Sequence, residues 1–242
     1  MRINKYVAQA TGLSRRKADE LIARGDVTVN GQQPSAGQDV TAVDEIKLGS
    51  TSLKLSEKVT IMLNKPVGYV VSRDGQGSRT IYDLLPAEYQ QLKPVGRLDK
   101  NSSGLLLLSN DGDLAQTLTH PSHQKTKVYE VTLYKPLTSE DKAKIERGVQ
   151  LEDGLSKLTV IPSVAEESRD KSTRGLSTPP HGSGRDDISW TVTMHEGRNR
   201  QIRRTFAALG YRVTHLHRTH FGEYALNGLS PGKITETLSH KA

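Results

Sequence analysis

The hydrophobic residues beyond position 58 lie mainly in short runs bounded by Gly, Pro, Asn or Ser, and this is the pattern of β-strands. The expected strands cover residues 59–63, 68–72, 105–109, 128–133, 158–164, 188–194 and 212–216. Fewer segments have helical spacing, and the expected helices cover residues 81–85, 113–119, 139–147 and 198–209. Because strands joined by short turns pair antiparallel, the sequence predicts an α+β fold with a mixed, largely antiparallel sheet and flanking helices.

The N-terminal segment has a different pattern, in which helical spacing comes first. One apolar helix stripe ends before Gly12 and consists of Ile3, Tyr6, Val7 and Ala10. Ser14 is expected to cap a second helix. Strands at 27–29 and 46–48 follow, with a hairpin signal at Asn30-Gly31. This segment therefore predicts a small unit of two helices plus short strands.

Two polar stretches divide the rest of the chain. Residues 50–58 read as a linker, so we expect a small domain with its linker over 1–58 and a larger domain over 59–242. Residues 166–187 contain one large apolar side chain, Leu176. Such a segment cannot bury enough surface to offset its ordering entropy, so the sequence predicts a disordered insertion there.

Positive charge is concentrated in two windows. The chain has 34 Lys and Arg against 27 Asp and Glu, a formal net charge of +7. Residues 1–25 hold six basic side chains against Asp19 and Glu20, and residues 195–220 hold six arginines against Glu196 alone. Two concentrated patches favour a polyanionic partner, although solvated helix faces are the simpler alternative for either one.

Composition excludes several classes of protein. The chain has no cysteine, which excludes disulfides, thiolate catalysis and Cys-ligated metal centres. No apolar run approaches the roughly 18 residues of a membrane span, and no signal peptide is evident, so we expect a cytoplasmic protein without membrane contact. No segment is typical of a symmetric apolar interface, and we expect a monomer. His215, His217 and His220 have no carboxylate beside them, which favours structural or phosphate-binding roles over metal ligation.

Three segments carry candidate chemistry. The first places Asp99 between Arg97 and Lys100, before the apolar run 105–108; cationic neighbours would keep this carboxylate ionised as a nucleophile or base. An aspartate before Asn-Ser-Ser-Gly is also typical of an ordinary turn. The second is the alternating strand around Tyr129, whose ring either joins the core or stacks on a base.

The third segment is 196–204. If it is helical, Arg200, Arg203 and Arg204 share one face while Ile202 lies on the apolar one. Three arginines on one face fit phosphate contacts, and one of them could turn inward onto a buried carboxylate. The alternative is a solvated basic face over a core stripe.

Over nearly its full length the chain resembles the RsuA-type family of ribosomal RNA pseudouridine synthases. Its start is similar to an S4 RNA-binding domain, in Arg2-Ile-Asn-Lys-Tyr-Val, Leu13-Ser-Arg-Arg-Lys-Ala-Asp and Gly25-Asp-Val-Thr-Val-Asn-Gly31. The remainder resembles the synthase motifs, in Leu63-Asn64-Lys65-Pro66-Val-Gly68, Gly96-Arg97-Leu98-Asp99, Ser103-Gly104-Leu105, Lys127-Val-Tyr129 and Gly197-Arg-Asn-Arg-Gln-Ile202-Arg203-Arg204.

The resemblance implies a role for each matching residue. Asp99 matches the catalytic carboxylate, Tyr129 and Ile202 match the residues on either side of the target base, and Arg203 matches the basic residue paired with the aspartate. Arg97 would help to occupy the space that the base leaves. The residues expected to contact RNA phosphates are Arg2, Lys5, Arg15, Arg16, Lys17, Arg200 and Arg204. The implied reaction moves no hydride, phosphate or electron, so neither a cofactor nor a metal is expected, and the expected partner is ribosomal RNA.

Two other functions remain as alternatives. In the first, an S4 domain and a degenerate synthase domain bind rRNA without chemistry; the presence of Asp99, Tyr129 and Arg203 argues against it. In the second, the histidines serve an RNA hydrolase or nuclease, which would need a metal or a His–carboxylate pair that the sequence does not offer.

Overall fold

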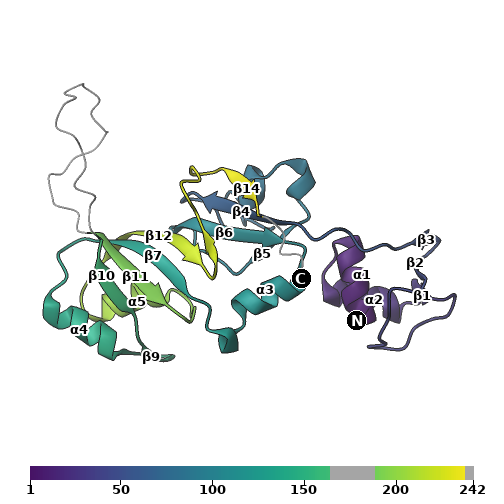
Figure 1. Ribbon diagram of the computed structural model, residues 1–242, viewed down its shortest axis with the longest axis horizontal. Helices are drawn as coiled ribbons and strands as arrows, with labels where there is room; N and C mark the ends of the chain where they lie inside the picture. Colours follow the sequence, from purple (N-terminus) through teal and green to yellow (C-terminus); the bar gives the residue numbers. More distant parts are fainter. Residues whose placement is uncertain (164–188, 238–242) are drawn as a thin grey trace, which may run out of the picture.

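The computed structural model describes residues 1–163 and 189–237, so the whole 166–187 segment, and with it the predicted disordered insertion, lies outside the described residues. Figure 1 shows a small N-terminal unit beside a larger one that is built on a long, twisted sheet. Each unit has its own cluster of buried apolar side chains.

The N-terminal unit contains two helices and a three-stranded sheet. Its elements are α1 (Ile3–Thr11), α2 (Arg15–Ala23), β1 (Val27–Val29), β2 (Ile46–Leu48) and β3 (Thr51–Ser52), with strand order β1-β2-β3. Ser14 caps α2 by accepting from the backbone N–H of Lys17, as expected. Asn30 and Gly31 have φ of 52° and 82° and form a tight turn, but β1 pairs with β2, which begins only at Ile46. The turn signal and the returning strand expected at 46–48 are therefore both confirmed, and directly after the turn Gln32 forms a single bridge with Val29.

The larger unit contains a nine-stranded sheet. Seven of its strands follow the order β10-β11-β7-β12-β6-β4-β14, while β13 pairs with β12 and β5 with β6. Their bounds are β4 (Thr60–Lys65), β5 (Lys93–Val95), β6 (Ser103–Ser109), β7 (Lys127–Leu133), β10 (Thr159–Pro162), β11 (Ser189–Met194), β12 (Val213–Phe221), β13 (Tyr224–Ala225) and β14 (Ile234–Glu236). A separate short pair is formed by β8 (Val149–Leu151) and β9 (Gly154–Ser156).

The two halves of this sheet meet where β12 runs parallel to β6, with His217 opposite Ser103 and Arg218 opposite Gly104. The other strand pairs described in the sheet are antiparallel. The α+β class with a mixed, largely antiparallel sheet is therefore confirmed. Gly104 has φ of +104°, and a Cβ there would lie 2.2 Å from the Arg218 carbonyl oxygen, so this junction requires glycine.

Helices flank the sheet: α3 (Gly112–Thr119), α4 (Ser139–Arg147) and α5 (Gln201–Ala208), together with the 3₁₀ turns η1 (Ile81–Leu84), η2 (Ala87–Tyr89) and η3 (Pro121–His123). In Figure 1, α3 lies between the sheet and α1. Two expectations were wrong in detail. Residues 68–72 form no strand, because they make a single bridge, between Val70 and Thr80. The helix expected from 198 begins at Gln201, because Arg200 adopts a left-handed conformation with φ of 47°.

Two separate apolar clusters cover the two faces of the sheet. Leu105, Leu106, Leu107 and Leu108 are all fully buried, as a continuous apolar run in a central strand predicts. Leu106 and Leu108 join the larger cluster, while Leu105 and Leu107 pack into a separate one with Phe221. No described helix is long and apolar enough to cross a membrane.

Candidate active site

A cleft of about 700 Å³ opens over the junction of β6, β7 and β12. Its walls come from the loop 96–102, the strands β7 and β12, the turn around α3 and η3, and the loop 194–200 that leads into α5. Seven lysines and arginines line it against two carboxylates, Asp99 and Glu196. An anionic ligand is therefore electrostatically favoured here.

Asp99 lies on the loop between β5 and β6, and its side chain remains 35% exposed. Lys65, at the end of β4, holds this loop through hydrogen bonds to its backbone. Its Nζ donates to the carbonyl oxygens of Ser102 at 2.7 Å and of Asp99 and Pro66 at 3.1 Å each. The Lys65 side chain is fully buried, and this burial lowers its pKa to about 8, against the opposing pull of the Asp99 carboxylate. Asp99 is thus placed by a loop with fixed backbone geometry.

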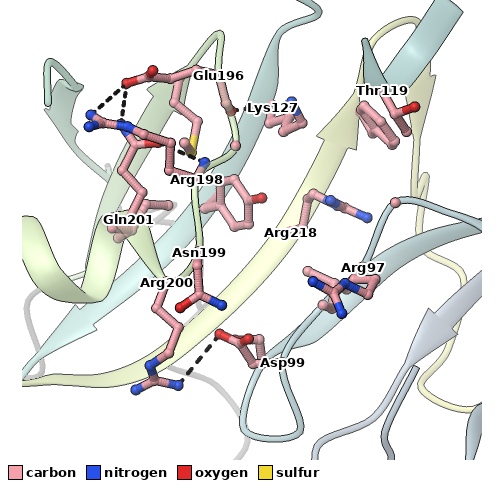
Figure 2. A pocket seen from close by; sticks show the side chains of 18 of the residues that line it. Arg97, Asp99, Thr119, Lys127, Glu196, Arg198, Asn199, Arg200, Gln201 and Arg218 are labelled. Carbon is pink, nitrogen blue, oxygen red and sulfur yellow. Dashed lines mark hydrogen bonds and ion pairs between the residues drawn. The ribbon is translucent and has the colours of Figure 1, made fainter. Parts of the chain in front are cut away.

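The cation that reaches the Asp99 carboxylate is Arg200, with Nη1 at 3.5 Å from Oδ2 (Figure 2). The sequence-based expectation gave this place to Arg203. The physical reason for the difference is the left-handed backbone at Arg200, which takes this residue off the helical face and turns it toward the loop. Lys100 points elsewhere, donating to the Ser78 hydroxyl at 3.0 Å.

Arg203 acts on the backbone beside Asp99. Its guanidinium donates to the carbonyl oxygen of Val213 on β12 and to that of Asn101, each at 2.8 Å. Burial and the nearby Arg200 charge lower the pKa of Arg203, while Asp99 opposes the shift. Arg203 therefore ties α5 to both β12 and the Asp99 loop.

Tyr129 and Ile202 line the cleft and are also part of the core, being 7% and 4% exposed. The Tyr129 ring thus packs on the core, as the first interpretation expected, and it also borders the cleft. Arg97 lines the same cleft, and its side chain is exposed and forms no hydrogen bond or ion pair with any described residue. Figure 2 shows Arg97 and Asp99 on the same loop.

Arg204 does not share a face with Arg200 and Arg203. It pairs with Asp153 at 2.6 Å and donates to the Asn199 carbonyl oxygen. Arg198 reaches the same Asp153 and also Glu196, each at 3.0 Å. The prediction of three arginines on one helix face was therefore wrong, and two of the arginines of this segment fix the loop 196–200 to the turn before β9.

The basic residues expected to contact RNA in the N-terminal unit lie on α1 and α2 or beside them, and most have local partners. Arg2 donates to the Gly37 carbonyl oxygen, and Arg15 donates to the Asn4 side chain. Lys17 pairs with Glu20, and Lys5 pairs with Asp113 of α3 at 2.6 Å. Arg16 forms no such contact within the described part of the chain. Arg2, Arg15, Arg16 and Lys17 are exposed, whereas Lys5 is half-buried.

Comparison with known proteins decides the family. The family model described as RNA pseudouridylate synthase matches residues 59–208, and that of the S4 domain matches residues 1–46. The chain belongs to the RNA pseudouridylate synthase family. The resemblance stated from the motifs is thereby confirmed, and the cleft described above lies within the matched synthase region.

Relatives of this synthase cover nearly the whole chain. The ribosomal large subunit pseudouridine synthase B of Bacillus subtilis is 35% identical, over 99% of this chain and 93% of that protein. The ribosomal small subunit pseudouridine synthase A of Vibrio vulnificus is 32% identical, over 96% and 94%. A solved pseudouridylate synthase structure has 30% sequence identity and a TM-score of 0.64, covering 98% of this chain and 96% of that one.

Motif reading missed two buried residues, one that holds the Asp99 loop and one that lines the synthase cleft. Lys65 was part of a quoted motif, but nothing in the pattern distinguished its fully buried ammonium from an exposed strand lysine. Arg218 was grouped with a basic strand, yet it is 2% exposed and lines the cleft. A signal did exist for Arg218: it is two residues after the buried Leu216 on β12, and this spacing places both side chains on the same face of the sheet.

Proposed function

We propose that this synthase converts uridine in ribosomal RNA to pseudouridine and that Asp99 is its catalytic residue. The observation that carries the proposal is the position of Asp99. Asp99 is a carboxylate that lines a cationic cleft, on a loop held by Lys65, with Arg200 Nη1 at 3.5 Å from its Oδ2. Relatives named for large- and small-subunit rRNA support ribosomal RNA as the substrate.

The reaction breaks the N1–C1′ glycosidic bond of uridine, turns the uracil, and joins its C5 to C1′. An ionised Asp99 serves this in either of two ways, by adding to C1′ or by taking a proton from the sugar. A base stacked in a helix must first be extruded. Tyr129 and Ile202 border the cleft where the extruded uracil would lie between them, and Arg97 is exposed at its edge, free to occupy the vacated stack.

RNA affinity comes from the basic surfaces around the cleft. We assign phosphate contacts to Arg2, Lys5, Arg15, Arg16 and Lys17 on the S4 domain and to Arg200 and Arg204 beside the cleft. We place the S4 domain with its linker at 1–58 and the catalytic domain at 59–242. A cytoplasmic location follows from rRNA as the substrate.

The test is the variant Asp99→Asn, which keeps the size of the side chain and removes its charge. Tritium release from an rRNA transcript with 5-tritiated uridine should disappear, while filter binding of the same transcript stays within about twofold of wild type. Glu140→Gln, a carboxylate change on the remote helix α4, is the matched control and should retain full turnover. Retained turnover in Asp99→Asn would overturn the assignment of Asp99 as the catalytic residue. If the wild-type protein binds the transcript but shows no turnover, it is a binding protein and not an enzyme.

A further inference from the structure

The guanidinium of Arg218 is buried in the floor of the cleft with part of its hydrogen-bonding capacity unused. Arg218 is 2% exposed and lines the cleft. Its Nε donates to the Leu105 carbonyl oxygen at 2.8 Å, whereas its Nη2 is buried and finds no hydrogen-bond acceptor among the described residues. A buried, unpaired donor is costly in a folded protein, and a ligand that supplies the acceptor would relieve that cost.

A second cation lies beside Arg218. The Lys127 Nζ and the Arg218 Cζ lie 5.3 and 4.8 Å from the centroid of the same Phe221 ring. Burial and, next, the charge of Arg218 lower the pKa of Lys127, and Glu196 opposes them. Within the described part of the chain no carboxylate forms an ion pair with either cation. Figure 2 shows Arg218 between Lys127 and Arg97.

The position of Arg218 in the sheet points to the base rather than to the RNA backbone. Arg218 is the cross-strand partner of Tyr129, so both side chains leave the sheet on the same face. A uracil ring stacked on Tyr129 would turn its carbonyl edge toward Arg218, the neighbour of Tyr129 on the same face of the sheet. The exposed arginines at the edge of the cleft would bind an RNA phosphate before it could reach the buried Arg218.

We propose that Arg218, with Lys127 beside it, forms an anion site that binds the uracil ring while the glycosidic bond is broken. The proposal rests on the function proposed above. When N1–C1′ breaks, the bonding pair remains on uracil, whose negative charge spreads over N1, O2 and O4. The electron-deficient C1′ side is satisfied by Asp99, through a C–O bond or by loss of a sugar proton to the carboxylate. The new C5–C1′ bond then forms as the C–O bond to Asp99 breaks, or as the carboxylate returns its proton to the sugar. The proton on C5 is released to solvent, and N1 takes up a proton from solvent. Arg218 donates to a carbonyl oxygen of the uracil anion and stabilises it.

The first test removes the donors and separates rate from affinity. Single-turnover rates of pseudouridine formation at saturating rRNA transcript should fall about a hundredfold in Arg218→Met, the scale seen when one preorganised donor is removed, and less in Arg218→Lys, which retains the charge. Transcript affinity should change less than about threefold. Arg73→Met is the control, since Arg73 also has one carbonyl hydrogen bond and one ring contact but does not line the cleft.

The second test changes the stability of the leaving group. Fluorine at C5 stabilises the uracil anion, so a transcript with 5-fluorouridine at the target depends less on Arg218. The rate is measured in a single turnover as the loss of 5-fluorouridine from digested transcripts. The ratio of the wild-type rate to the Arg218→Met rate should be smaller for the 5-fluorouridine transcript than for the uridine transcript. A merely structural role for Arg218 would give equal ratios for both transcripts.

The outcomes are distinct. Weaker transcript binding with an unchanged rate at saturation would overturn the proposal and identify a phosphate site, and equal ratios for the two transcripts would also overturn it. If circular dichroism shows that Arg218→Met does not fold, Arg218→Lys and Lys127→Met carry the same comparison. Failure of the proposed function itself is recognised separately, because wild type would then form no pseudouridine.

Discussion

At the scale of single residues, the synthase cleft depends on side chains that hold backbone atoms. Lys65 is the clearest case: its ammonium group is inside the protein and makes three hydrogen bonds to carbonyl oxygens, two of them in the Asp99 loop. Arg203 does the same from the other side, through Asn101 and Val213. The carboxylate is thus positioned by its loop, and its ion pair with the half-exposed Arg200 is the weaker restraint.

Lys65→Met tests this view through the pH dependence of stability. The native pKa of about 8 lies below the unfolded value of 10.5, so between these values the unfolded chain binds more protons than the folded one. The stability of wild type relative to Lys65→Met should therefore rise from pH 8 toward 10.5. At pH 7 the variant also removes three hydrogen bonds to carbonyl oxygens. Urea denaturation at pH 7, 8.5 and 9.5 measures the difference, and a difference that is flat with pH would contradict the titration.

Arg203→Met should lower turnover more than Arg200→Asn does. The first change releases the Asn101 carbonyl and the loop that carries Asp99, whereas the second removes a partly exposed ion pair and retains a residue type that tolerates the left-handed backbone. We expect a fall of about tenfold or more in kcat for Arg203→Met. Steady-state tritium release measures both variants, and a larger loss in Arg200→Asn would show that the ion pair is the main restraint.

Arg97, Asp99, Tyr129 and Ile202, which the motifs single out, all line one cleft, and each lies on a strand, loop or helix that the sequence pattern indicates. It could not predict which arginine reaches Asp99. That choice depends on the backbone torsion of one residue, and a helical reading of 198–209 has no means of detecting a left-handed turn at a non-glycine position.

At the scale of elements, the junction of β6 and β12 sets the geometry of the cleft. Gly104 and Arg218 are opposite each other there, and the strands approach so closely that no side chain fits at Gly104. Long strands such as the apolar β6 and the alternating β7 were predictable, since their patterns extend over several residues. The two- and three-residue strands β5, β8, β9, β13 and β14 were not, because pairing with a neighbour defines them rather than any local pattern.

Gly104→Ala should be strongly destabilising. A Cβ would lie 2.2 Å from the Arg218 oxygen and 2.5 Å from its nitrogen, both backbone atoms of a central strand, and φ of +104° is strained for alanine. A loss of about 3 kcal/mol or more in the free energy of unfolding is expected. Gly112→Ala at the start of α3, where φ is ordinary and no atom lies within 4 Å, is the control and should be neutral or slightly stabilising. Urea denaturation of both variants decides, and equal stability would exclude the close approach.

At the scale of the whole molecule, the S4 domain and the synthase sheet touch through polar contacts. Lys5 of α1 pairs with Asp113 of α3, and Lys93 of β5 donates to the Leu13 carbonyl oxygen at 2.7 Å. Figure 1 shows α3 and α1 as neighbours. Small polar contacts of this kind permit relative movement of two units. The sequence predicted the two units from their patterns, but nothing in the sequence indicated which surfaces they share.

Replacing both Arg15 and Arg16 by Ala should weaken rRNA binding and make it less dependent on salt. Both side chains are exposed on α2, and each phosphate contact that is lost reduces the slope of log affinity against log salt by about 0.7 to 0.9. We expect a slope smaller by about 1 to 2 and an unchanged melting temperature. Filter binding between 50 and 300 mM salt measures it, and an unchanged slope would show that this surface does not bind RNA.

The parallel pairing of β6 with β12 also has a consequence for the order of folding. Ser103 and His217, which are opposite each other there and hydrogen-bonded, are 114 residues apart in the chain. Closing so long a loop is entropically slow, while helices and local turns form early. The cleft lies over the β6–β12 pairing, which is expected to form late. The catalytic geometry is therefore completed after most of the secondary structure has formed. On refolding from denaturant, pseudouridine formation should return later than the far-ultraviolet circular dichroism signal. A newly made chain thus has most of its secondary structure before it is active as an enzyme.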